Sequence, residues 1–183
     1  SLQNVGIQKD DLETLQKNLI VSDAVGVGRC FDTEVSRAIM LLRVNALAKG
    51  FSGIRVEVIE TFIEMLNKGV TPQIREKGSV GSSGDLCPLA HMVLVPMGLG
   101  EAEYKGKIMD GKSAMEAAGI PLITLKAKEG LALINGTCAM MGNAVLAVYD
   151  AMVLEKCADI IASFTIDAME GVIDAYDPRV HYA

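Results

Sequence analysis

Apolar residues recur every three or four positions along most of the chain, the spacing of one face of an α-helix. In the first such segment Leu12, Leu15 and Leu19 share a face, and Glu13 and Lys17 lie outside it. The same spacing predicts helices over residues 10–21, 33–49, 54–67, 85–98, 113–119 and 126–134, and one long helix or two abutting ones across 138–175. Because no segment shows the strict alternation of a β-strand, the pattern predicts an all-α fold.

Residues that favour helix ends agree with these limits. Asp32 or Thr33 is expected to cap the second helix, and Ser113 the short fifth one, because their side-chain oxygens can accept the free N–H groups of a first turn. Pro88 falls in the first turn of the fourth helix, where a missing N–H is tolerated. Residues 104–107 read Tyr-Lys-Gly-Lys and are expected to form a turn.

Length and composition narrow the class of protein. The 183 residues are expected to form a single domain. Half of them are apolar and few are aromatic, a more aliphatic mixture than is usual for a soluble domain of this size. Two explanations stay open: the chain buries much of its surface against partner subunits, or it is part of a larger polypeptide. The net charge of −6, without a basic stripe, argues against nucleic acid as a partner.

The cysteines, the absence of metal-ligand spacing and the short apolar runs together predict a soluble, cytoplasmic protein. Its four cysteines are widely spaced and form no C-x-x-C pair, as expected of free thiols in a reducing compartment. No cluster of residues has metal-ligand spacing, so no metal is expected. The apolar run 86–99 is too short to span a bilayer, and Pro88, His91 and Pro96 interrupt it, so no membrane is expected. His91 itself is expected to be a core residue.

The segment from Gly78 to Leu86 is the strongest candidate for chemistry. It holds three glycines and three serines directly before an apolar helix. Such a loop allows a close approach of backbone to backbone or to a ligand, so it could cradle a phosphate or do chemistry on its own backbone. It lacks the Gly-Lys-Ser/Thr ending of a P-loop, and Gly26-Val27-Gly28 lacks the third glycine of a dinucleotide fingerprint. A nucleotide is therefore not expected.

The loop and three flanking blocks resemble a known family. The segment Gly78-Ser-Val-Gly-Ser-Ser-Gly-Asp-Leu-Cys-Pro-Leu-Ala-His91 is similar to the signature of the aromatic amino acid ammonia-lyases, the histidine and phenylalanine ammonia-lyase family. Residues 16–28, 45–53 and 128–137 resemble further blocks of that family, in the family's order. The resemblance implies a long-helix bundle of the fumarase/aspartase type, with the glycine–serine loop at a helix N-terminus.

By this resemblance, Ser82, Ser83 and Gly84 cyclise autocatalytically to 4-methylidene-imidazol-5-one. The amide nitrogen of Gly84 attacks the carbonyl carbon of Ser82, which requires a tight bend without a Cβ in the way. Ser83 loses its hydroxyl as water and leaves an exocyclic methylene, the electrophile of the family's reaction. The family usually has alanine at the position of Ser82, whose side chain stays outside the ring and need not prevent cyclisation.

The resemblance also implies a substrate site. Asn135 of the Asn-Gly-Thr block would contact the prosthetic group and the amino acid moiety of the substrate, and Leu86 would contact the substrate. Asp23 stands where histidine- and tyrosine-specific members commonly have histidine and phenylalanine-specific ones have an apolar residue. A carboxylate there would favour a side chain such as imidazole through a charge-assisted hydrogen bond. The alternative, that Asp23 is only a cap or turn residue, stays open.

The family's enzymes are several hundred residues long, so we expect this chain to be the central section of a lyase. In the family, the catalytic base is a tyrosine ahead of the first matching block, and an arginine that holds the substrate carboxylate lies beyond the last block. None of the chain's four tyrosines matches the base. The resemblance implies a homotetramer that eliminates ammonia from an aromatic L-amino acid, with histidine favoured. Two alternatives stay open: an aminomutase of the same family, and a catalytically silent helical fragment or scaffold.

Overall fold

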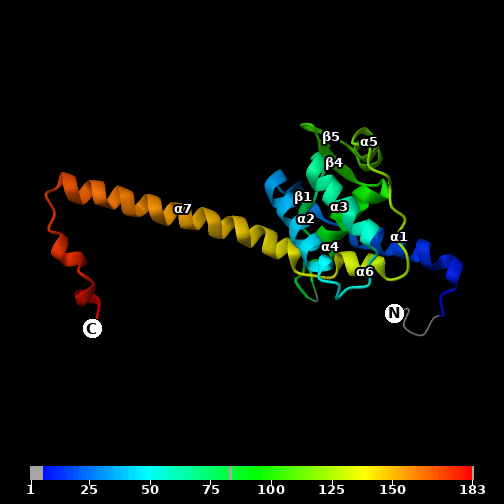
Figure 1. Cartoon of the computed structure of the whole chain (residues 1–183), viewed down its shortest axis with the longest axis horizontal. Coiled ribbons are helices and arrows are strands. Elements are labelled where there is room, and N and C mark those ends of the chain that lie inside the picture. The colour runs from blue at the N-terminus through cyan, green and yellow to red at the C-terminus, as the bar shows by residue number, and fades with distance from the viewer. Residues whose placement is uncertain (1–5, 83, 183) are drawn as a thin grey trace. The chain divides into compact units, whose positions relative to one another are not determined.

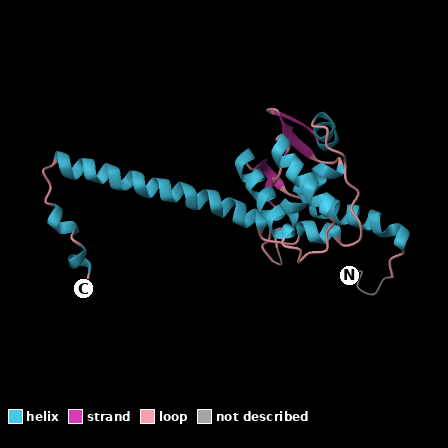
Figure 2. Ribbon diagram, viewed as in Figure 1, coloured by secondary structure: helices cyan, strands magenta, loops and turns pink. Residues whose placement is uncertain are grey.

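The computed structural model describes residues 6–82 and 84–182 of the chain (Figures 1 and 2). The chain divides into two compact units, Ser1–Ala144 and Val145–Ala183. The elements in chain order are η1 Lys9–Asp11, α1 Leu12–Asp23, β1 Val27–Cys30, α2 Thr33–Ala48, α3 Val56–Lys68, β2 Thr71–Pro72, β3 Arg75–Lys77, α4 Leu86–Leu94, η2 Val95–Met97, β4 Glu101–Tyr104, β5 Lys107–Asp110, α5 Gly111–Ala117, α6 Glu129–Ile134, α7 Cys138–Ala168, η3 Ile173–Tyr176 and η4 Pro178–His181. Helices dominate, which confirms the all-α class. Most predicted helices occur within a few residues of their expected limits, but α7 is one continuous helix that ends at Ala168, seven residues before the predicted limit of 175.

The structure adds two small antiparallel sheets that the sequence pattern did not predict. In the first, β1 pairs with β3, and in the second the strand order is β2-β4-β5. Each strand is two to four residues long, too short to show an alternation of apolar and polar positions. The expected turn at 104–107 is the tight connection between β4 and β5, where Lys105 and Gly106 both have positive φ, 51° and 74°, as a two-residue hairpin turn requires.

Two predicted helix caps differ from the structure. Asp32 occupies the N-cap position of α2 with extended backbone, but its side chain accepts no capping hydrogen bond within the described residues. In α5 the cap is Asp110, whose carboxylate accepts the N–H of Ser113 at 2.9 Å. The prediction of Ser113 as the cap was wrong, because β5 delivers Asp110 to the helix start and Ser113 then lies inside the first turn.

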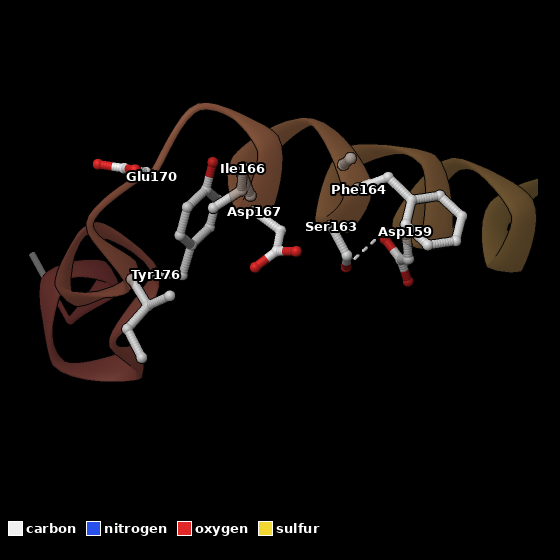
Figure 3. Close-up of a pocket in the computed structure, with 10 residues that line it drawn as sticks. Asp159, Ser163, Phe164, Ile166, Asp167, Glu170 and Tyr176 are labelled. Carbon is white, nitrogen blue, oxygen red and sulfur yellow. Dashed lines mark hydrogen bonds between the residues drawn. The ribbon is translucent and has the colours of Figure 1, made fainter.

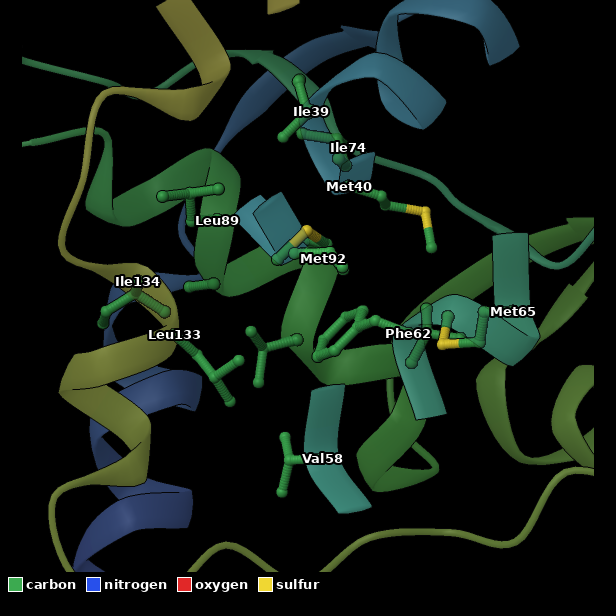
Figure 4. Packing of buried hydrophobic residues seen from close by; sticks show 14 of the residues in the cluster. Ile39, Met40, Val58, Phe62, Met65, Ile74, Leu89, Met92, Leu133 and Ile134 are labelled. Atoms are coloured by element: carbon green, nitrogen blue, oxygen red, sulfur yellow. The ribbon is translucent and has the colours of Figure 1, made fainter. Parts of the chain in front are cut away.

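The hydrophobic core of the first unit surrounds α4. Figure 4 shows side chains of α2, α3 and α6 converging on Leu89 and Met92 of that helix. Fully buried members of this cluster are Ile20, Ile39, Met40, Phe62, Met65, Ile74, Leu89, Met92, Met115 and Leu133. Because α4 is apolar on nearly all sides and enclosed by other helices, its N-terminal end, where the glycine–serine loop joins it, is rigidly anchored.

Helix α7 is apolar along its length but buried only at its start. Cys138, Ala139 and Gly142 are buried, whereas the large apolar residues from Val145 onward are exposed. By length and composition, the stretch Glu129–Ala168, in which an 18-residue window has a mean hydropathy of 1.6, could cross a membrane. A helix that is apolar all round is equally typical of the interior of a large assembly, so composition alone does not distinguish the two.

Candidate functional site

The glycine–serine loop connects β3 to α4 and packs backbone against backbone at its end. Gly84 is buried and has φ +125°, a conformation that favours glycine. A Cβ placed on Gly84 would lie 2.7 Å from the amide nitrogen and 2.9 Å from the carbonyl oxygen of Gly136. Only a residue without a side chain fits between the loop and the 135–136 turn. Position 84 therefore requires glycine for two reasons, its positive φ and the lack of room for a Cβ.

Asp85 ties the loop to two other segments. Its amide donates to the carbonyl oxygen of Gly136 at 2.6 Å. Its carboxylate accepts the hydroxyl of Ser79 at 2.7 Å, on the other side of the loop, and the amide of Met140 in the first turn of α7 at 2.9 Å. A buried carboxylate at the N-terminal end of a helix is stabilised by the free amides there. One residue therefore holds the loop, the 135–136 turn and the start of α7 together.

Asn135 lies just after α6, with its side chain at the protein surface beside a hollow. The residue is exposed, and the hollow of about 260 Å³ is bordered by α2, the 51–53 loop and α6. Behind it, the guanidinium of Arg43 donates to the carbonyl oxygens of Ala132 and, at 2.9 Å, of Asn135. The end of α6 is thus fixed from the core side, and Asn135 borders the hollow.

The segment that follows α1 crosses the base of the loop. Asp23 is the last residue of α1 and is half-buried. The carboxylate lies close enough to Cys87, in the first turn of α4, to help raise the pKa of that thiol, although burial of the thiol is the larger cause. Among the described residues Asp23 makes no side-chain hydrogen bond, and an acid at a helix C-terminus is disfavoured by the helix dipole. Asp23 therefore does not cap α1 through its side chain.

His91 joins the same segment to α4. Its Nε2 accepts the amide of Gly26 at 3.0 Å. Burial, and secondarily the nearby charge of Arg75, lower the pKa of His91, so the neutral ring that can accept this bond is favoured at neutral pH. The prediction of His91 as a core residue is too simple, since the ring is half-buried and anchors the 24–28 segment rather than filling the core.

The structure brings only some of the predicted site residues together. Gly84 meets the turn that contains Asn135, Leu86 is the first residue of α4 and half-buried, and Ser82 is exposed in the loop. Ser83 lies outside the described residues. Asp23 is on the neighbouring segment. Sequence reasoning missed the two residues that organise this site, Asp85 and Arg43, although a lone acid directly before a helix and a basic residue on an apolar helix face are detectable signals.

The family model for aromatic amino acid lyases matches residues 1–183. The chain belongs to this family. It is 67% identical over 179 residues to histidine ammonia-lyase 2 of Fusobacterium nucleatum, covering 98% of this chain and 35% of the relative. Its structure is similar to that of histidine ammonia-lyase from Trypanosoma cruzi, with a TM-score of 0.92, 37% identity, and coverage of 98% of this chain and 35% of that one. Phenylalanine aminomutase from Pantoea agglomerans gives a TM-score of 0.90 at 40% identity, over 96% of this chain and 34% of that one.

This lyase-family chain thus spans about a third of the length of the relatives it matches. Family membership and structural similarity agree with the resemblance found in the sequence. They also agree with the long-helix fold, since the similar structures are themselves lyases and aminomutases of this kind.

A second hollow lies in the unit 145–183, and no residue of the glycine–serine loop lines it. It has a volume of about 730 Å³ and lies between the end of α7 and η3 (Figure 3). Its lining combines three carboxylates, Asp159, Asp167 and Glu170, with the rings of Phe164 and Tyr176. None of the predicted site residues lines it, so we do not assign it to the candidate site.

An ion pair between the buried carboxylate of Glu129 and the exposed side chain of Arg55 supports the start of α6, the helix that leads to Asn135. The Glu129 carboxylate accepts the amide of Arg55 at 3.0 Å, its Nε and Nη2 at 2.9 Å, and the amide of Lys126 at 2.7 Å. Burial by itself would raise the pKa of Glu129, but the hydrogen bonds from Arg55 and Lys126 outweigh it and lower that pKa. The carboxylate is therefore more stable in the folded protein than in the unfolded chain.

Glu129→Gln is expected to lower the free energy of unfolding by about 2 kcal/mol at pH 7, because it removes the buried charge that accepts hydrogen bonds from Arg55 and Lys126. A carboxyl whose pKa is lowered by folding contributes stability above its ordinary pKa, and the contribution is lost as the pH falls through the folded value. Urea unfolding measured from pH 7 down to about pH 3 follows both effects, and the difference in stability between wild type and variant should shrink as the pH falls. Glu60→Gln, at an exposed position of α3, is the control; an equal loss in both variants would contradict the prediction.

Proposed function

We propose that this chain is part of an ammonia-lyase that eliminates ammonia from an aromatic L-amino acid, with histidine as the favoured substrate. The observation on which this rests is the packing of Gly84 against Gly136, held by the Asp85 amide at 2.6 Å. This contact puts the loop of the cyclising triad beside the turn that contains Asn135. The names of the similar proteins, histidine ammonia-lyases among them, support the reaction and the substrate.

The described residues fit the prosthetic group expected from Ser82, Ser83 and Gly84. Gly81 and Ser82 are exposed, Gly84 is buried, and the backbone at Gly84 leaves no room for a Cβ. When formed, 4-methylidene-imidazol-5-one supplies an electrophile that the ordinary side chains lack. The protein residues hold its surroundings: Asp85 fixes the bend, and Asn135 faces the adjoining hollow, where it would orient the amino acid moiety of the substrate.

Asp23 is proposed to select the substrate side chain, and Leu86 to contact it. The side chain of Asp23 makes no hydrogen bond among the described residues, and its carboxylate lies close to Cys87, next to Leu86. Its carboxylate would accept a hydrogen bond from an imidazole N–H. A phenyl ring would leave the same carboxylate unpaired on burial, which costs free energy.

The assembly proposed for this protein is a homotetramer in the cytoplasm, in which these residues form one domain of a longer lyase involved in amino-acid catabolism. The exposed apolar residues of α7 support burial against other chains, because an apolar helix face of this length is otherwise left in contact with water. Free cysteines, two of them buried, fit a reducing compartment.

An aminomutase is the second candidate. The aminomutase from Pantoea agglomerans is more similar in sequence, at 40% identity, than the Trypanosoma cruzi lyase, at 37%. An aminomutase returns the ammonia to the β-carbon, so the two activities differ in their product. A catalytically silent scaffold would release no ammonia and form no β-amino acid.

The proposed function is tested by the turnover of histidine and phenylalanine in the wild-type protein and in Asp23→Leu. The wild type is expected to release ammonia from histidine faster than from phenylalanine. Asp23→Leu should lower kcat/KM for histidine about 30-fold, the effect of losing a charge-assisted hydrogen bond worth about 2 kcal/mol, and leave phenylalanine unchanged or improved. Ammonia release and the amino acid products are measured together.

Asp10→Leu makes the same replacement at an exposed residue just before α1 and should leave the ratio of the two rates unchanged. Unchanged relative rates in Asp23→Leu would remove Asp23 from substrate selection. Accumulation of a β-amino acid would favour the aminomutase, and a protein without either product would favour the scaffold.

A further inference from the structure

Arg43 is a charged residue buried in the core of the first unit. It lies on α2 with 6% of its surface exposed. No carboxylate forms an ion pair with it among residues 6–82 and 84–182. A buried guanidinium is costly unless its N–H groups find acceptors, so its hydrogen bonds indicate why it is there.

The acceptors of Arg43 are at the end of α6. Nη2 donates to the carbonyl oxygens of Ala132 and Asn135, and Nη1 lies 3.9 Å from the sulfur of Cys138. The last carbonyls of a helix have no partner within the helix, and here the guanidinium supplies one. A Cβ on Gly136 would overlap Nη1, so Arg43 also lies directly against the turn.

The same turn meets the glycine–serine loop on its other side. The carbonyl of Gly136 accepts the amide of Asp85, and its backbone packs on Gly84. The position of this turn relative to α2 is therefore fixed by Arg43, and its position relative to α4 by the loop. We infer that Arg43 is a positioning residue, which holds Asn135 and Gly136 in register with the loop of the cyclising triad.

The geometry assigns Arg43 a positioning role rather than contact with substrate. Nη2 is occupied by two carbonyl oxygens, and Nη1 faces Gly136 and Cys138. Nε is buried without a hydrogen-bond partner. The hydrogen bonds of Nη1 and Nη2 have to offset the free-energy cost of burying it. The effect on catalysis rests on the proposed function; the effect on the turn does not.

Arg37 provides a matched control on the same helix. Its Nη1 donates to the carbonyl oxygen of Leu66, near the end of α3, at 3.0 Å. The two arginines thus make the same kind of contact from α2 to the end of another helix, but only Arg43 reaches the 135–136 turn. Any general cost of losing such a contact should appear in both variants.

The experiment compares Arg43→Met, Arg43→Lys and Arg37→Met in the whole protein. In Arg43→Met the Asp85 amide, which reports on its bond to Gly136, should exchange its hydrogen about tenfold faster. The value of kcat/KM for histidine should fall about 100-fold, as expected when a catalytic group is misplaced by about 1 Å. Arg43→Lys should recover part of both losses, because an ammonium can reach one carbonyl but not fork to two. Arg37→Met should match the wild type in both measurements.

Rates are expressed per chain that has lost two waters, which separates misplacement of the turn from incomplete ring formation. Arg43→Met behaving like Arg37→Met in both measurements would overturn the inference. A wild type that releases no ammonia would contradict the proposed function instead, and the exchange of the Asp85 amide would still decide whether Arg43 holds the turn.

Discussion

Ser83→Ala is expected to yield a protein that does not lose two waters and whose turnover is reduced by at least about 1,000-fold, since it removes the group that becomes the electrophile. Cyclisation followed by dehydration releases two water molecules, and the second of these contains the Ser83 hydroxyl. An alanine at 83 has no leaving group, so no methylene forms. Intact-mass measurement of wild type and variant detects the difference directly, and ammonia release from histidine measures the loss of activity.

Ser82→Ala is the matched control for this experiment. It deletes a neighbouring hydroxyl that the ring does not need, and it restores the residue usual in the family, so both the mass loss and the turnover should persist. A wild-type protein at its full sequence mass, or a Ser83→Ala protein that still loses two waters, would contradict the assignment of the triad.

Asp85→Ala is expected to reduce ring formation and also stability. The carboxylate accepts hydrogen bonds from Ser79 and from the Met140 amide, and the residue is only 4% exposed. Losing a buried charged acceptor for two donors should lower the free energy of unfolding by about 3 kcal/mol. The carboxylate would no longer tie Ser79 to the start of α7, although the amide of residue 85 could still donate to Gly136. Urea unfolding and the fraction of chains that lack two waters measure the two effects in the same preparation.

Asp110→Ala separates a lost cap from a disturbed loop. Asp110 also accepts an amide at a helix start, that of Ser113 in α5, but it is exposed and outside the loop. Its replacement should leave ring formation complete. If Asp85→Ala also forms the ring completely, the carboxylate supports α7 and the loop only as a structural element and does not assist cyclisation.

The sequence predicted the parts of this molecule that depend on local periodicity. The leucines of α1, the glycine after α3 and the proline in the first turn of α4 each follow from backbone preferences of a few adjacent residues. The short strands were not predictable in this way, because β1 and β3 are defined by pairing between segments almost 50 residues apart. Their register is a tertiary property.

In the candidate site, too, local features were predictable and long-range contacts were not. Gly84 was predictable as a residue without a side chain, but the reason found in the structure is its neighbour Gly136, 52 positions further along the chain. Asp85 and Arg43 stand out in the sequence as a lone acid and a lone base, but their roles could not be assigned, because most of their partners are main-chain groups far along the chain and a residue pattern does not identify these. The roles of Asp23, Asn135 and Leu86 stay predictions.

The meeting of Gly84 and Gly136 has a consequence for how such a site can change. A Cβ on Gly84 would meet the backbone of Gly136, whereas a Cβ on Gly136 would meet the guanidinium of Arg43. A substitution at 84 can therefore only push the loop away from the turn, and one at 136 can only push the turn away from α2. The spacing at this contact is already at its lower limit, so variation within the fold has to accumulate at other positions.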